Sequence, residues 1–166
     1  MAILEQLKNV LPAHLGETLK LRALGMLKIP VLFFIAPTVV ELNERRCVVR
    51  VPLNFRTKNH LGSMYFGVLA AGADCAGGLI AWKAIEENDP RVKLIFKDFH
   101  ADFLKRAEGD VHFTSEDGLA IVELVKKAAA SGERENLPVH IIATCPKKTG
   151  DEPVARFTLT LSLKRK

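Results

Sequence analysis

The chain has 166 residues, of which 48% are apolar and 26% charged, and its formal net charge at pH 7 is +5. This composition is typical of one folded domain with a real hydrophobic core, and it excludes disordered and collagen-like classes. Three cysteines without a C-x-x-C pair indicate neither a disulfide framework nor a zinc site, so we expect a reducing, cytoplasmic location.

The first residues, MAILEQLK, include an acidic side chain and lack the basic start of a signal peptide. The apolar segments 29–36 and 66–82 are too short for membrane-spanning helices, so no membrane span is expected. Basic residues form small scattered clusters without interleaved aromatic residues, which predicts no nucleic-acid partner. A positive net charge attracts any polyanion, and it suits a small phosphorylated ligand such as coenzyme A as well as it suits a nucleic acid.

Apolar residues at helical spacing predict two helices within residues 2–28, separated near Pro12. Short β-branched runs at residues 38–42 and 47–51 then predict a β-hairpin. We expect a single domain composed of a helical extension, residues 1–37, and a core, residues 38–166.

The stretch FGVLAAGADCAGGLIAW, residues 66–82, contains one charged residue, Asp74. Ser63 is placed to cap a helix that begins at Met64 or Tyr65 and ends near Glu87. Because this helix is apolar on every side, it must be covered on every side. Glycines weaken a helix, so their number here indicates close approach of neighbouring groups. They are Gly67, Gly72, Gly77 and Gly78.

Residues 93–104 alternate as a long strand, and a turn at 107–110 leads into a strand at 110–114. A helix is predicted at 116–130, followed by strands at 139–145 and 155–164. Strict alternation places two sets of side chains on opposite faces of the first of these strands. One set is Ile95, Phe99, Ala101 and Phe103, and the other is Leu94, Phe96, Asp98, His100 and Asp102.

The predicted class is therefore α+β, with an antiparallel sheet of about six strands curled around the apolar helix. His100, Asp98 and Asp102 share a strand face, but their spacing is commonplace and we expect no metal site.

The segment NHLGSMYFGVLAAGAD resembles the hotdog-fold acyl-CoA thioesterases of the phenylacetate-pathway type. Those proteins carry N-x-x-G-x-x-H-G-G followed by L-A-D. Asn59, Gly62, Gly67 and Asp74 stand at the matching offsets, whereas Tyr65 and Phe66 replace the histidine and the first glycine of the pair. FLKRAEGDVHFTSE is similar to the family's strand, glycine turn and strand. The resemblance covers about residues 38–164 and implies the hotdog fold and an acyl-CoA substrate.

Thioester hydrolysis needs a base or nucleophile and donors for the developing oxyanion. Asp74 is the candidate base or nucleophile, and burial would raise its proton affinity. The amides of Phe66 and Gly67, at the positive end of the helix, are candidate oxyanion donors. By resemblance, Asn59 orients the water or the thioester. Candidate substrate-binding residues are Tyr65, His60, Gly62 and Met64.

Eight residues separate Phe66 from Asp74, roughly 12 Å along a helix, which is too far for both to contact one carbonyl. Two antiparallel copies of the helix would bring the missing partner from a second subunit. We therefore expect a homodimer, and the resemblance implies that two dimers could form a tetramer. No cofactor is expected.

Three of these features also have a purely structural interpretation. Asp74 could cap a neighbouring backbone amide or pair with Arg or Lys across the dimer, and Asn59 could form a turn with its own backbone. Residues 29–36 could pack the first helices on the sheet or roof an acyl tunnel. The alternative function is a non-catalytic hotdog module that binds acyl chains or CoA esters.

Overall fold

The computed structural model describes residues 14–166, so the first predicted helix, before Pro12, lies outside the described residues. Two helices, α2 (Leu15–Leu27) and α3 (Pro30–Ile35), precede a hairpin of β1 (Thr38–Leu42) and β2 (Cys47–Val51). A loop leads to the long helix α4 (Phe66–Asn88). The remaining elements are β3 (Val92–Phe103), β4 (Val111–Ser115), α5 (Gly118–Ser131), β5 (Glu135–Thr144), α6 (Pro146–Thr149) and β6 (Pro153–Arg165).

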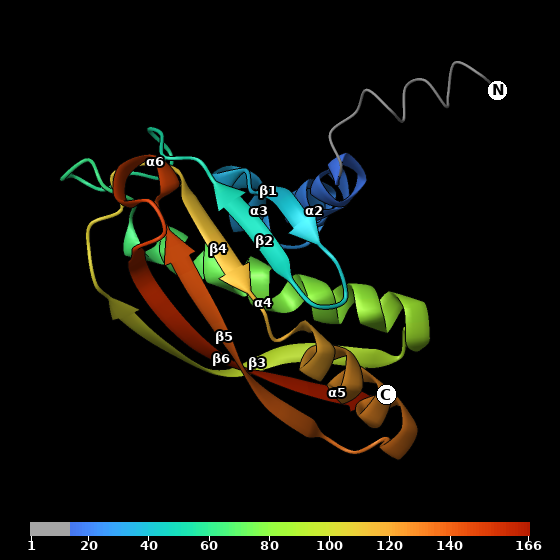
Figure 1. Cartoon of the computed structure of the whole chain (residues 1–166). Coiled ribbons are helices and arrows are strands. Elements are labelled where there is room, and N and C mark those ends of the chain that lie inside the picture. Colours follow the sequence, from blue (N-terminus) through green and yellow to red (C-terminus); the bar gives the residue numbers. More distant parts are fainter. Residues whose placement is uncertain (1–13) are drawn as a thin grey trace, which may run out of the picture.

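The six strands form one antiparallel sheet in the order β1-β2-β4-β5-β6-β3, with β1 and β3 at its edges. The sheet curves around α4, which contacts β2, β4, β5, β6 and β3 (Figure 1). Helix α5 packs beside α4, and its residues Ile121, Val125 and Ala128 are buried. The predicted α+β architecture, a curled sheet around a central apolar helix, is confirmed.

The long helix meets the length and hydropathy expected of a membrane-spanning segment, but 67% of its most apolar window is buried inside the domain. That burial is the environment expected for the core helix of a globular domain. Within residues 14–166, α4 is the one helix that meets these criteria.

Several local features differ from the sequence prediction. Ser63 does not cap α4: the helix begins at Phe66 after Tyr65, while the buried Ser63 accepts a hydrogen bond from Asn59 Nδ2 at 3.1 Å. Residues 146–149 form the short helix α6 instead of an open turn. Strand β5 begins at Glu135, four residues before the predicted start. Pro138 is compatible with a strand at this point because β4 pairs only with residues 141–144 of β5. Among the described residues, the edge of β5 beside Pro138 is therefore unpaired and needs no hydrogen-bond donor.

The predicted alternation of β3 is wrong because the strand contains a β-bulge. Phe96 lies opposite Leu161 of β6 and Phe99 opposite Leu159, so three residues of β3 match two of β6. The extra residue reverses the inward and outward faces for the rest of the strand. Consequently Leu94 and Phe96, before the bulge, share the inner face with Phe99, Ala101 and Phe103, after it.

Two glycines of α4 give opposite predictions for the same substitution. A methyl group at Gly72 would overlap the ring of Phe113, which is fully buried, whereas one at Gly78 would meet the Phe96 ring at an ordinary 3.5 Å. Gly72→Ala should lower the free energy of unfolding by about 1–3 kcal/mol through overpacking. Gly78→Ala should raise it by about 0.5–1 kcal/mol through helix propensity. Urea denaturation measures both, and equal stability of the two variants would contradict this packing of Phe113.

Candidate functional site

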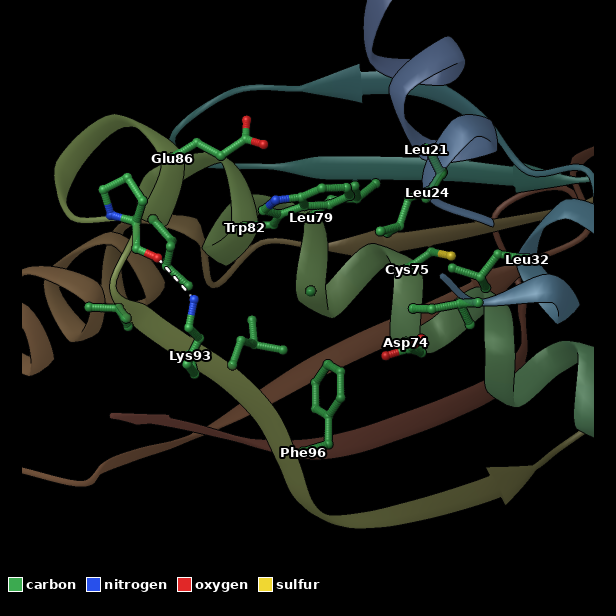
Figure 2. Close-up of a pocket in the computed structure, with 16 residues that line it drawn as sticks. Leu21, Leu24, Leu32, Asp74, Cys75, Leu79, Trp82, Glu86, Lys93 and Phe96 are labelled. Atoms are coloured by element: carbon green, nitrogen blue, oxygen red, sulfur yellow. Dashed lines mark hydrogen bonds between the residues drawn. The ribbon is translucent and has the colours of Figure 1, made fainter. Parts of the chain in front are cut away.

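Asp74 lies in the middle of α4, and its carboxylate points into a pocket of about 380 Å³ (Figure 2). Helices α2 and α3 form one wall of this pocket, α4 forms its floor, and β3 forms the opposite wall. The lining is mainly apolar: Leu21, Leu24, Ile29, Leu32, Cys75, Gly78, Leu79, Trp82, Ile85, Pro90, Val92, Leu94 and Phe96 accompany Asp74, Glu86 and Lys93. Most of these residues were not singled out from the sequence, since their apolar character alone does not distinguish a pocket wall from the core.

Burial raises the pKa of Asp74 to about 6. Among residues 14–166, the carboxylate has no hydrogen-bond or ion-pair partner, so the interpretation of Asp74 as a cap of a backbone amide finds no support within this part of the chain. A group with this pKa is deprotonated at neutral pH and retains enough basicity to accept a proton. Asp74 therefore has the properties required of a general base.

Cys75 also lines the pocket, but its thiol is not suited to nucleophilic attack. Burial, followed by the negative charge of Asp74, raises the pKa of the Cys75 thiol well above its usual range. The thiolate is the reactive form, so this cysteine is an inert small core residue.

The loop before α4 contains most of the other predicted site residues, and none of them lines this pocket within the same protomer. Asn59 forms a turn: its Oδ1 accepts the amides of Leu61, at 2.9 Å, and Ser63, at 3.2 Å. Met64 is buried in the core, whereas His60, Gly62 and Tyr65 are exposed. Asp74 is thus separated from its predicted partners in one chain.

The N-terminus of α4 offers free backbone donors. Val68 and Leu69 donate to the Tyr65 carbonyl at 2.9 and 3.1 Å, but the amides of Phe66 and Gly67 have no acceptor among the described residues. Tyr65 provides no side-chain cap. Two unpaired N–H groups at a helix N-terminus attract negative charge, which is the arrangement an oxyanion requires.

Aromatic side chains surround these amides and extend to the edge strand. Tyr65 and Phe66 pack at a centroid distance of 4.7 Å, and Phe66 meets Phe103 of β3 edge to face at 6.5 Å. Phe66 is 60% exposed and Phe103 52% exposed. An aromatic cluster beside an unpaired strand edge is typical of a protein interface.

A curved antiparallel sheet wrapped around one long apolar helix is the hotdog fold, and similar solved structures confirm this class. The chain covers 96% of a Pseudomonas aeruginosa protein described as a "Protein of Unknown Function" and "Probable Thioesterase", with 22% identity over 90% of this chain and a TM-score of 0.72. It covers 98% of a Chlorobaculum tepidum protein of unknown function, with 12% identity over 93% of this chain and a TM-score of 0.76. It covers 82% of a Haemophilus influenzae thioesterase, with 15% identity over 81% of this chain and a TM-score of 0.62.

The chain belongs to the family described as "Domain of unknown function (DUF4442)", whose model matches residues 18–163. This match begins within α2, includes α3 and α4, and ends within the last strand of the sheet, β6. A search of curated proteins finds no significant match.

Proposed function

We propose that this protein hydrolyses acyl-CoA thioesters at two equivalent sites across a homodimer. The observation that carries the proposal is the Asp74 carboxylate, which faces an apolar pocket with a pKa of about 6 and no partner among residues 14–166. The thioesterase names of the similar structures support a thioester hydrolase at a general level.

In this mechanism Asp74 removes a proton from a water molecule as the water oxygen attacks the thioester carbonyl carbon. Negative charge then develops on the carbonyl oxygen, where the Phe66 and Gly67 amides of the second protomer stabilise it. The tetrahedral intermediate collapses with cleavage of the carbon–sulfur bond. The proton taken up by Asp74 passes to the departing CoA thiolate, which leaves a carboxylic acid and free CoA.

The distance between Phe66 and Asp74 is the reason for proposing a site shared by two protomers. Phe66 and Asp74 lie on one continuous helix, eight residues or roughly 12 Å apart. The exposed aromatic cluster at Tyr65, Phe66 and Phe103, beside the free edge of β3, provides the apolar surface through which a second copy would bring its own amides.

A non-catalytic module that binds CoA esters is the second candidate. Two observations favour it: Tyr65 and Phe66 replace the histidine–glycine pair of the resembled thioesterases, and the Asn59 side chain is occupied by its own loop. In that case the pocket would hold the acyl group without cleaving it.

One assay separates the two candidates. The protein is incubated with short, medium, long and aromatic acyl-CoAs while released thiol is followed by a colorimetric reagent. Turnover of at least one ester is expected. If no ester is cleaved while a CoA ester raises the melting temperature, the binding module is correct instead.

A further inference from the structure

We propose that helices α2 and α3 dock this protein on the surface of an anionic lipid membrane, with the exposed face of α3 inserted among the lipids. The contact surface consists of six exposed apolar side chains, here termed the apolar patch, and the basic residues beside them. The patch comprises Met26, Leu27, Val31, Phe33, Phe34 and Phe55. Docking does not depend on the proposed hydrolysis, since it uses the outer surface of the two helices and not the pocket beneath them.

The exposed face of α3 is entirely apolar. Leu32 and Ile35 are buried, whereas Val31, Phe33 and Phe34 are 51%, 50% and 52% exposed. At about 100° per residue, the four exposed positions of this helix span an arc of about 160°, and all four are apolar. A helix face in contact with water normally presents polar side chains, so we expect an apolar medium to cover this face.

Close packing joins α3, the end of α2 and the loop after β2 into one surface. A methyl group at Gly25 of α2 would overlap the backbone nitrogen of Phe33, so the two helices are in contact at this point. In the loop, the Arg56 guanidinium lies 5.9 Å from the centre of the Phe34 ring and 5.8 Å from that of Phe55. Figure 1 shows α2 and α3 together on the side of the domain where β1 lies. The members of the apolar patch are therefore neighbours.

The charge around the apolar patch has a single sign. Residues 18–40 and 52–73 include no acidic side chain, and their basic residues are Lys20, Arg22, Lys28, Arg56 and Lys58. In the described part of the chain, Lys28, Arg56 and Lys58 have no carboxylate partner, and Arg56 Nε is buried without a hydrogen-bond acceptor. Positive charge beside exposed apolar side chains is the combination that binds anionic lipid surfaces.

The uniform charge favours a lipid surface over a second copy of the chain. A two-fold interface through the apolar patch would bring the patch of one subunit against the same patch of its partner, so basic side chains would face basic side chains. Like charges at close range repel each other. The proposed dimer is instead built on β3, whereas α2 contacts β1, at the opposite edge of the sheet.

Binding to vesicles tests the proposal with the full chain. Sedimentation measures partition onto phosphatidylcholine vesicles with about one third phosphatidylglycerol, and onto vesicles of phosphatidylcholine alone. The anionic vesicles should bind the protein at least a hundredfold more tightly, since each of three unpaired basic side chains contributes about fivefold. High salt should reduce this preference. Equal binding to both kinds of vesicle, or no binding to either, would overturn the proposal.

Polar substitutions test insertion of α3. The double variant Phe33→Gln/Phe34→Gln should bind anionic vesicles at least tenfold more weakly, because insertion buries the exposed half of each ring. The matched control is Leu119→Gln/Ile142→Gln, at side chains that are 49% and 45% exposed on α5 and β5. That control should bind as the unaltered protein does. An equal loss in both variants would show that α3 is not the contact surface.

Charge reversal tests the basic residues in the same assay. Lys28→Glu/Lys58→Glu should bind anionic vesicles about 25-fold more weakly or worse. Lys126→Glu/Lys164→Glu, at exposed positions on α5 and β6, has the same net charge and should bind normally. Charges remote from the membrane are screened at about 0.1 M salt, where the Debye length is about 10 Å. If both variants weaken binding equally, the vesicles respond to net charge alone and the docking surface is wrong.

A fluorescent label distinguishes lipid from protein as the covering of the apolar patch. Cys47, Cys75 and Cys145 are buried, so an environment-sensitive dye can be attached selectively to Phe33→Cys. Its emission should shift to shorter wavelength when anionic vesicles are added, whereas the same dye on Leu119→Cys should not respond. Emission that is already at short wavelength and insensitive to vesicles would overturn the proposal. Light scattering would then identify the covering: a lower molecular mass in Phe33→Gln/Phe34→Gln indicates a second copy, and an unchanged mass indicates another segment of the same chain.

Discussion

Replacement of Asp74 by asparagine is expected to lower kcat for thioester hydrolysis by about two to four orders of magnitude, the contribution typical of a positioned general base. The amide keeps the size of the carboxylate but cannot accept the proton of the attacking water. Released CoA thiol measures the effect with the best ester found in the acyl-CoA assay. Asp151→Asn, in the exposed turn before β6, is the matched control and should retain full activity.

The pH dependence of activity provides an independent check on the same carboxylate. Because burial raises the pKa of Asp74 to about 6 and the base acts in its deprotonated form, kcat/KM should rise with pH through about 6 and then level off. An activity that stays constant from pH 5 to pH 8, or Asp74→Asn with unaltered turnover, would remove Asp74 from the mechanism.

The same substitution should stabilise the fold at alkaline pH. The pKa of Asp74 is 3.8 for the free side chain and about 6 in the folded protein, so the folded state holds a proton that the unfolded state has released between these values. Stability therefore falls as pH rises through this window and is constant above it. Asp74→Asn should be more stable than the unaltered protein by up to about 3 kcal/mol at pH 8 and equally stable below about pH 4, by urea denaturation.

Removal of a single backbone donor is expected to have the second large effect. Phe66 is the first residue of α4, its amide has no acceptor among the described residues, and Tyr65 before it is extended, with φ −65° and ψ 138°. Proline suits this position and lacks only the N–H group. Phe66→Pro should therefore lower kcat by about two to three orders of magnitude through loss of an oxyanion donor. Phe66→Ala, which keeps the amide, controls for loss of the ring and should lose much less activity.

Mixing the two inactive variants tests the shared site directly. In a mixed dimer of Asp74→Asn and Phe66→Pro, one site combines both defects, while the other combines an intact Asp74 with intact amides. Unfolding and refolding the variants together should restore about a quarter of the original activity, because half of the dimers are mixed and each has one complete site. If the mixture remains inactive although mixed dimers form, each site lies within one protomer.

The sequence predicts the elements that local patterns specify. The helix at 66–88 follows from a long uncharged run that ends before Pro90, and the hairpin at 38–51 follows from two β-branched segments around a polar turn. Errors occur where pairing decides the outcome. Proline at 138 ends a strand by local rules, yet strand β5 continues through it because one of its edges is unpaired at that point.

The candidate site likewise combines a residue that the sequence predicts with a pocket that it does not predict. Asp74 is conspicuous in the sequence because a carboxylate within an apolar helix carries a desolvation penalty. The pocket that it faces is not visible in the sequence, since Leu24, Trp82 and Phe96 come from three separate elements. Phe96 is on the inner face together with Phe99 because the bulge in β3 reverses the alternation between them.

By itself, the sequence determined that one apolar helix must be enclosed by a curled sheet and that a single acid lies within it. These properties depend on hydrophobic periodicity, which acts over neighbouring residues. Only the tertiary structure decided that α2 and α3 stand over that acid as a pocket wall, and that the amides at the start of α4 have no acceptor within residues 14–166. Both are consequences of packing between segments distant in the chain, which local sequence patterns do not encode.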